Sequence, residues 1–224
     1  MPSVFVTGAG RGLGLELARQ YAADGWRVTG TVRNDGAAKT LEALGARSLS
    51  LDVTDFGAVK RLGERLRGEP IDVLVCNAGI SGRRGMALGS FDYEEWDQVL
   101  RVNLLGAAAV IEALVDNVAA SEKKIIALLS SRMGSISGTS GSTIPYSSSK
   151  AALNLLAKAL SVQLASRGVI VVALHPGWVK TDMGGAGAPL GPEESVRGLR
   201  RVLDGLGSEH AGAFLAHDGS VIAW

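Results

Sequence analysis

The sequence has little that would cross-link the chain or give it a strong charge. Its single cysteine, Cys76, excludes an intramolecular disulfide, and its three histidines form no spaced ligand pattern with that thiol. Lys and Arg total 23 against 22 Asp and Glu, so the chain lacks the basic excess that binding a nucleic-acid backbone requires. We therefore expect a cytoplasmic protein with no metal site and no nucleic-acid partner.

Long apolar runs are also missing. The longest, over residues 104–111, is well short of the ~18 residues that span a bilayer. The first residues enter the apolar stretch 4–6 directly, without the basic region that precedes a signal peptide. We therefore expect neither a membrane span nor a secretory signal.

Short apolar segments alternate with helix-like segments along the chain. Aromatic residues are 5% of the sequence, so Ala, Leu, Val and Ile must fill the core. Strands that are apolar throughout and separated by helices are typical of a parallel sheet buried on both faces. The pattern predicts strands at 4–7, 27–32, 48–51, 71–76, 124–129, 169–174 and 213–215, and helices at 13–23, 37–43, 54–67, 93–118, 150–166 and 193–203, with Thr54 as a helix cap.

This order predicts an α/β fold: a doubly wound parallel sheet of the Rossmann type, in three αβα layers. We find no internal repeat and no long linker, so residues 1–224 are expected to form a single domain. Two helical stretches, residues 100–115 and 151–165, carry few charges on any face. They predict a homo-oligomer, a dimer or tetramer, that associates through these helices.

A glycine-rich turn, residues 7–14, joins the first predicted strand to the first helix. Glycines there let backbone N–H groups approach a pyrophosphate, with the anion at the positive end of the helix. A P-loop is excluded because no Gly-Lys-Ser/Thr follows. The turn therefore predicts a dinucleotide site.

The residues about 20 positions after the turn bear on the choice of dinucleotide. An acidic residue there usually binds the ribose 2′-OH, but this chain has Thr31, Val32 and Arg33. Arg33 and Arg11 could together pair with a 2′-phosphate. We therefore expect NADP(H) to be preferred over NAD(H).

Tyr146 and Lys150 lie four residues apart, which places them on one face of a helix. A phenol has a pKa of ~10, and a neighbouring cation lowers it by favouring the ionised form. The pair therefore predicts a proton donor for a carbonyl. Two unrelated surface residues at a helix start are the alternative.

Four motifs in order resemble the short-chain dehydrogenase/reductase family over essentially the whole chain. They are Thr7-Gly8 with Gly12 and Gly14, Asn77-Ala78-Gly79, a Ser upstream of Tyr146 and Lys150, and Pro176-Gly177. The segments 130–136 and 175–183, with Trp224, are similar to the branch containing the sniffer carbonyl reductase and the bacterial C-factor signalling protein. Cys76 departs from the family's frequent Asn and is expected to be a buried thiol.

The resemblance implies four catalytic residues. Tyr146 would be the general acid/base, and Lys150 would lower its pKa and hold the nicotinamide ribose. Ser131 would bind the substrate carbonyl, with Ser135 as the alternative because the loop to Tyr146 is about two residues longer than usual. Asn103 would anchor a water for proton relay.

The resemblance also implies the cofactor contacts. Asp52 would meet the adenine, residues 77–79 the adenosine side, and Val179 with Thr181 the nicotinamide carboxamide. The full expected set is Gly8, Arg11, Gly12, Leu13, Gly14, Arg33, Asp52, Val53, Asn77, Ala78, Gly79, Tyr146, Lys150, Pro176, Gly177, Val179 and Thr181.

The function these observations predict is NADPH-dependent reduction of an aldehyde, ketone or quinone to an alcohol. The alternative is an NADP(H)-binding signalling or scaffold protein with little turnover. A serine hydrolase is disfavoured because no Gly-x-Ser-x-Gly occurs. The substrate pocket is expected between residues 131–136, Trp178 and a small lid over 183–192, and Met133, Ile136 and Trp178 suggest an apolar carbonyl.

Overall fold

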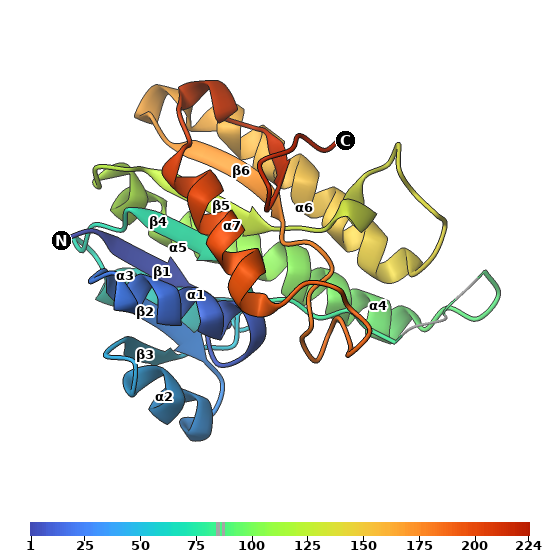
Figure 1. The fold of residues 1–224 in the computed structure, drawn as a ribbon, viewed down its shortest axis with the longest axis horizontal. Coiled ribbons are helices and arrows are strands. Elements are labelled where there is room, and N and C mark those ends of the chain that lie inside the picture. Colours follow the sequence, from blue (N-terminus) through green and yellow to red (C-terminus); the bar gives the residue numbers. More distant parts are fainter. Residues whose placement is uncertain (84–85, 87) are drawn as a thin grey trace.

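The computed structural model describes residues 1–83, 86 and 88–224. Within them, seven strands form one sheet in the order β3-β2-β1-β4-β5-β6-β7, with every neighbouring pair parallel (Figure 1). The strands are β1 Ser3–Val6, β2 Arg27–Val32, β3 Arg47–Ser50, β4 Val73–Cys76, β5 Ile125–Leu129, β6 Ile170–His175 and β7 Phe214–Ala216. The strand order reverses between β1 and β4, and ligands of such sheets bind in the crevice outside the strand ends at that point.

Helices cover both faces of the sheet, which confirms the predicted three-layer, doubly wound fold in one domain. One face carries α1 Gly12–Ala23, α2 Asp35–Glu42 and α7 Pro192–Asp204; the other carries α3 Phe56–Arg65, α5 Gly106–Ala119 and α6 Ile144–Gln163, with α4 Tyr93–Leu100 beside α6. Successive residues of β4 face opposite layers: Leu74 packs with α5, whereas Val75 packs in the core that contains α1. Cys76 is buried in the α5 layer, as expected of a structural thiol.

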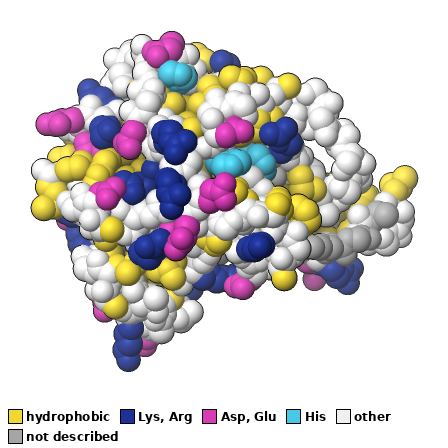
Figure 2. Space-filling view, in the orientation of Figure 1, with side chains coloured by type: hydrophobic (Ala, Val, Ile, Leu, Met, Phe, Trp, Pro, Cys, Tyr) yellow, Lys and Arg dark blue, Asp and Glu magenta, His cyan; other side chains and the backbone are white. Residues whose placement is uncertain are grey.

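Charges of both signs are interspersed on the face formed by α1 and α7 (Figure 2). Arg19 contacts Glu16 at 2.6 Å, and Arg200 joins α7 to Asp24 at 2.5 Å. Acidic and basic residues, which are nearly equal in number, thus pair with each other on this face.

The helix predicted over 93–118 is interrupted by a π-helical turn, Arg101–Leu105, between α4 and α5. The combined stretch Tyr93–Ala119 is 27 residues long and apolar enough to cross a membrane by length and composition. Its α5 portion, however, packs against α3 and against β4 and β5. This packing buries 39% of the most apolar 18-residue window in the stretch.

Two predicted helix starts are wrong. Asp55, rather than Thr54, caps α3 by accepting a hydrogen bond from Ala58 N at 2.8 Å, because the Thr54 hydroxyl donates to Asp52. The helix predicted to begin at residue 150 begins at Ile144, where Pro145 suits the first turn. This earlier start places the segment 146–150 entirely within helix α6.

Candidate active site

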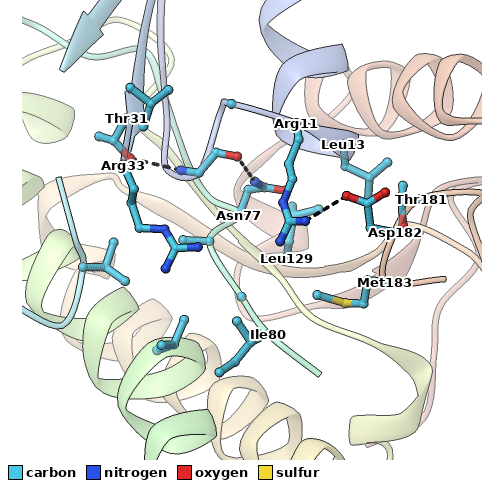
Figure 3. Close-up of a pocket in the computed structure, with 18 of the residues that line it drawn as sticks. Arg11, Leu13, Thr31, Arg33, Asn77, Ile80, Leu129, Thr181, Asp182 and Met183 are labelled. Carbon is cyan, nitrogen blue, oxygen red and sulfur yellow. Dashed lines mark hydrogen bonds and ion pairs between the residues drawn. The ribbon is translucent and has the colours of Figure 1, made fainter. Parts of the chain in front are cut away.

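A cleft runs along the carboxyl ends of the strands, over the switch point between β1 and β4 (Figure 3). Most of the predicted cofactor residues line it: Gly8, Arg11, Gly12, Leu13, Arg33, Asp52, Val53, Asn77, Ala78, Gly79, Tyr146, Lys150, Pro176 and Thr181. The sequence motifs therefore converge on one cleft.

The glycine-rich turn is held by strands on both sides of β1. Gly8 N donates to Thr31 Oγ1 at 3.0 Å, and Asn77 Nδ2 donates to Gly8 O at the same distance (Figure 3). Gly14 lies outside the cleft lining, but a Cβ there would sit 2.3 Å from Gly8 O, so the helix packs this closely only with glycine. In this part of the chain, no described side chain caps the first N–H groups of α1. These donors remain available for an anion.

Arg11 and Arg33 both line the cleft but lie apart in this structure, so their joint binding of a 2′-phosphate stays a prediction. Arg11 turns across the cleft and pairs with Asp182 at 2.8 Å, whereas Arg33 lies on the other side of the turn (Figure 3). Arg33 lies close enough to Asp52 to help lower the pKa of that carboxyl, although the hydrogen bonds from Thr54 contribute more. Arg33 therefore occupies the end of the cleft predicted for the adenosine.

Tyr146 and Lys150 lie at the other end, on α6. Lys150 is 5% exposed, and its Nζ lies 5.7 Å from the centre of the Tyr146 ring while donating to Leu129 O at 2.7 Å. Burial lowers the pKa of Lys150 to about 8. For Tyr146, the surrounding protein displaces water and raises the pKa of the phenol, and a hydrogen bond with Ser131 opposes this shift.

The two candidate serines have different partners. Ser131, two residues after β5, accepts a hydrogen bond from Met133 N at 3.2 Å and lies close enough to the Tyr146 hydroxyl to lower the pKa of that phenol. Ser135 donates instead to the carbonyl oxygen of Ala223 at 2.7 Å. The structure therefore brings Ser131, and not Ser135, to Tyr146.

Asn103 sits in the π-helical turn and is 1% exposed. Its Oδ1 accepts from Ile80 N at 2.8 Å, and its Nδ2 donates to Ile80 O and to Ser149 Oγ, both at 2.9 Å. Ser149 Oγ in turn donates to Tyr146 O at 2.7 Å. The side chain of Asn103 thus joins the segment after β4 to the second turn of α6. The relay of protons by water stays a prediction.

Two further predicted cofactor residues, Gly177 and Val179, are outside the cleft lining. Val179 is 4% exposed, and its backbone bridges to Leu190. A Cβ on Gly177 would lie 2.8 Å from the Leu190 side chain. Both shape the segment before the predicted lid, where Thr181 Oγ1 accepts from Gly184 N at 3.1 Å.

Several lining residues were not predicted. They include Thr31, Asn34, Ile80, Gln98, Leu129 and Asp182, whereas Met183, which also lines the cleft, begins the predicted lid. Ile80 directly follows the Asn-Ala-Gly motif, and Asp182 follows Thr181, so their neighbours in the sequence were the available signal. Gln98 and Leu129 reach the cleft through the packing of α4 and β5, which no local pattern reveals.

Comparisons with known proteins agree with this geometry. The family model described as short chain dehydrogenase matches residues 2–188. C-signal of Myxococcus xanthus is 42% identical over 156 residues, which cover 69% of this chain and 93% of that protein. The carbonyl reductase Sniffer of D. melanogaster superposes with a TM-score of 0.91 at 33% identity over 100% of both chains.

An NADPH-bound carbonyl reductase from chicken fatty liver is also similar in structure. Its TM-score is 0.90 at 32% identity, over 100% of this chain and 99% of that one. The family model covers most of the sequence and the fold matches over its whole length. The chain belongs to the short-chain dehydrogenase/reductase family of oxidoreductases.

Proposed function

We propose that this protein reduces a carbonyl compound (an aldehyde, a ketone or a quinone) to an alcohol with NADPH. The observation that carries the proposal is the placement of Ser131 and Lys150 beside Tyr146, which lines one end of the cleft. The glycine-rich turn and Arg33 form the other end. One cleft thus combines a dinucleotide cradle with a proton donor.

The residues present fit NADP(H). The uncapped N–H groups of α1 suit a pyrophosphate, and Arg33 suits a 2′-phosphate because a guanidinium makes charge-assisted, bidentate bonds to it. The similar carbonyl reductase from chicken fatty liver binds NADPH, which supports the same choice for this chain. Preference over NAD(H) is part of the proposal.

Bound NADPH supplies the hydride to the carbonyl carbon. Ser131 donates a hydrogen bond to the carbonyl oxygen and polarises it, and Tyr146 donates its proton to that oxygen. Lys150, while protonated, favours the phenolate that Tyr146 becomes. Asn103 keeps its predicted role of anchoring the water through which solvent returns a proton to Tyr146.

Apolar side chains favour an apolar carbonyl substrate. Ile136 is 75% exposed and Trp178 is 59% exposed, on the segments that follow Ser131 and Gly177. Met183 lines the cleft, and Trp178 Nε1 donates to Gly184 O at 2.9 Å, which ties the start of the proposed lid to the wall. A substrate with a flat apolar body would cover these exposed surfaces.

A second candidate is an NADP(H)-binding signalling or scaffold protein with little turnover, favoured by the 42% identity to C-signal. The state of Lys150 counts against it. Burial that lowers the pKa of a lysine to about 8 costs stability. A scaffold that binds NADP(H) would use this ammonium to hold the nicotinamide ribose, but it gains nothing from the phenol of Tyr146 beside it.

Self-association in the cytoplasm is also part of the proposal. Leu155 and Val162 on α6 are 69% and 70% exposed, and Leu105 before α5 is 43% exposed. Apolar side chains on these helices suit a second copy of the chain. Sedimentation of the wild type against Leu155→Glu tests this, because a charge at the interface should shift the oligomer towards monomer.

Isotope transfer tests the function. The protein is incubated with NADPH deuterated at the nicotinamide C4 and a panel of aldehydes and ketones, and the products are analysed by mass spectrometry. Quinones are tested separately by the loss of NADPH absorbance, because a hydroquinone keeps no deuterium on carbon. We expect at least one alcohol that carries one deuterium on the former carbonyl carbon. Bound cofactor with no labelled alcohol and no consumption of NADPH by any compound would support the signalling alternative.

A further inference from the structure

Asn154 continues the helix face that carries Tyr146 and Lys150. It lies four residues after Lys150, one turn further along α6, so the three side chains share one stripe of the helix. Asn154 is 2% exposed. A buried amide must find partners for its donors and its acceptor.

Both partners of Asn154 flank Ser131. Ser130 Oγ donates to Asn154 Oδ1 at 2.5 Å, and Asn154 Nδ2 donates to Gly134 O at 3.1 Å. Ser130 immediately precedes Ser131, and Gly134 ends the 3-10 turn that follows it. One side chain therefore bonds both sides of the segment that carries the proposed substrate-binding hydroxyl.

The same segment packs directly on α6. A Cβ on Gly134 would lie 2.7 Å from the carbonyl carbon of Lys150, so the turn lies against the helix backbone. On its outer side, Arg132 N donates to His175 Nδ1 at 3.2 Å. Asn154 supplies the side-chain bonds on the inner side, where Ser131 meets Tyr146.

We propose that Asn154 is a positioning residue that holds Ser131 against Tyr146 by bonding the residues on either side of its turn. The effect of Asn154 on catalysis rests on the proposed function. The positioning of Ser131 does not depend on that function, because it concerns contacts between residues of this chain.

The first test compares two buried asparagines. Asn154→Leu removes both bonds with little change in size, and Asn117→Leu is the matched control. Asn117, on α5, is 5% exposed and donates to Leu66 O and Glu69 O, remote from the cleft. We expect Asn154→Leu to lower kcat about 10- to 100-fold, because small displacements of a reacting geometry cost that much. Asn117→Leu should retain kcat, and both should bind NADPH as the wild type does.

A double-mutant cycle separates positioning from general damage. In a Ser131→Ala background, Asn154→Leu should have little further effect on kcat, since the hydroxyl that it positions is gone. The proposal would be overturned if the factors by which Ser131→Ala and Asn154→Leu lower kcat multiplied in the double variant. Equal losses of kcat in Asn154→Leu and Asn117→Leu would also overturn it. If Asn154→Leu does not fold, Ser130→Ala removes one of the two bonds and enters the same cycle.

The second test needs no turnover. The chain has three tyrosines, so 13C labelling at tyrosine Cζ gives few NMR signals, and Tyr146→Phe identifies the one from Tyr146. Because the hydrogen bond with Ser131 lowers the pKa of Tyr146, Asn154→Leu should raise that pKa towards its value in Ser131→Ala. An unchanged pKa would overturn the positioning role even in a protein that reduces no carbonyl. A raised pKa without turnover would leave the positioning intact and refute the proposed function alone.

Discussion

The Lys150 ammonium lies 5.7 Å from the centre of the Tyr146 ring and is held there by the carbonyl oxygen of Leu129, 2.7 Å from Nζ. The lysine is buried, and burial lowers its pKa to about 8. The protein therefore keeps a destabilised cation beside its proposed proton donor.

Burying the charged ammonium of Lys150 costs free energy, so we predict that Lys150→Met stabilises the protein at neutral pH. A lysine titrates near ~10.4 when unfolded, so between about 8 and that value the unfolded chain binds more protons and stability rises with pH. Below pH 8 the wild type bears the full cost of burying the charge. We expect a gain of about 1–3 kcal/mol in the free energy of unfolding at pH 7, which shrinks towards pH 10.5.

Urea denaturation at both pH values measures the gain. Lys158→Met on the exposed side of the same helix is the control, and it should change stability little at either pH. A Lys150→Met protein that is less stable than the wild type at pH 7 would contradict the account of the buried charge.

Arg33 predicts the choice of cofactor. Arg33→Asp removes the guanidinium from the adenosine end and replaces it with a charge that repels a 2′-phosphate. We expect the Kd of NADPH to rise about 10- to 100-fold, as lost charge-assisted hydrogen bonds imply, and the Kd of NADH to change little. Fluorescence titration with both cofactors measures this. If NADPH and NADH binding weakened equally, Arg33 would not be the residue that binds the 2′-phosphate.

The pair between Arg11 and Asp182 joins residues 171 positions apart across the cleft. Asp182→Asn should release Arg11 and remove a negative charge from the cleft, so NADPH should bind a few-fold more tightly at low salt. Since both side chains are exposed, salt should screen the effect. Titrations at low and high ionic strength check this, and tighter binding that persists in high salt would argue against an electrostatic cause.

The sequence was sufficient for the fold because its apolar strands and its glycine-rich turn follow local rules. The helix start at Ile144 was missed because a run of serines favours helix weakly, whereas Pro145 fits a first turn. The π-helical turn around Asn103 was missed because it shifts the helical periodicity by a single position.

The sequence predicted which residues belong to the site better than it predicted the contacts between them. Spacing could not choose between Ser131 and Ser135, because the choice depends on Ala223, which binds Ser135 from the far end of the sequence. Likewise, no local pattern shows that Arg11 meets Asp182, or that Asn154 bonds both sides of the turn after Ser130. These contacts exist only once the parallel strands bring their ends together.

The most direct test of the account compares wild type with Tyr146→Phe at saturating NADPH, on a carbonyl identified by isotope transfer. The substitution removes one hydroxyl and keeps the ring that Lys150 contacts. We predict unchanged NADPH affinity and a kcat lower by about 10²- to 10⁴-fold, the usual contribution of a positioned general acid. Equal kcat in the two proteins, with cofactor bound equally, would contradict the assignment of Tyr146 as the proton donor.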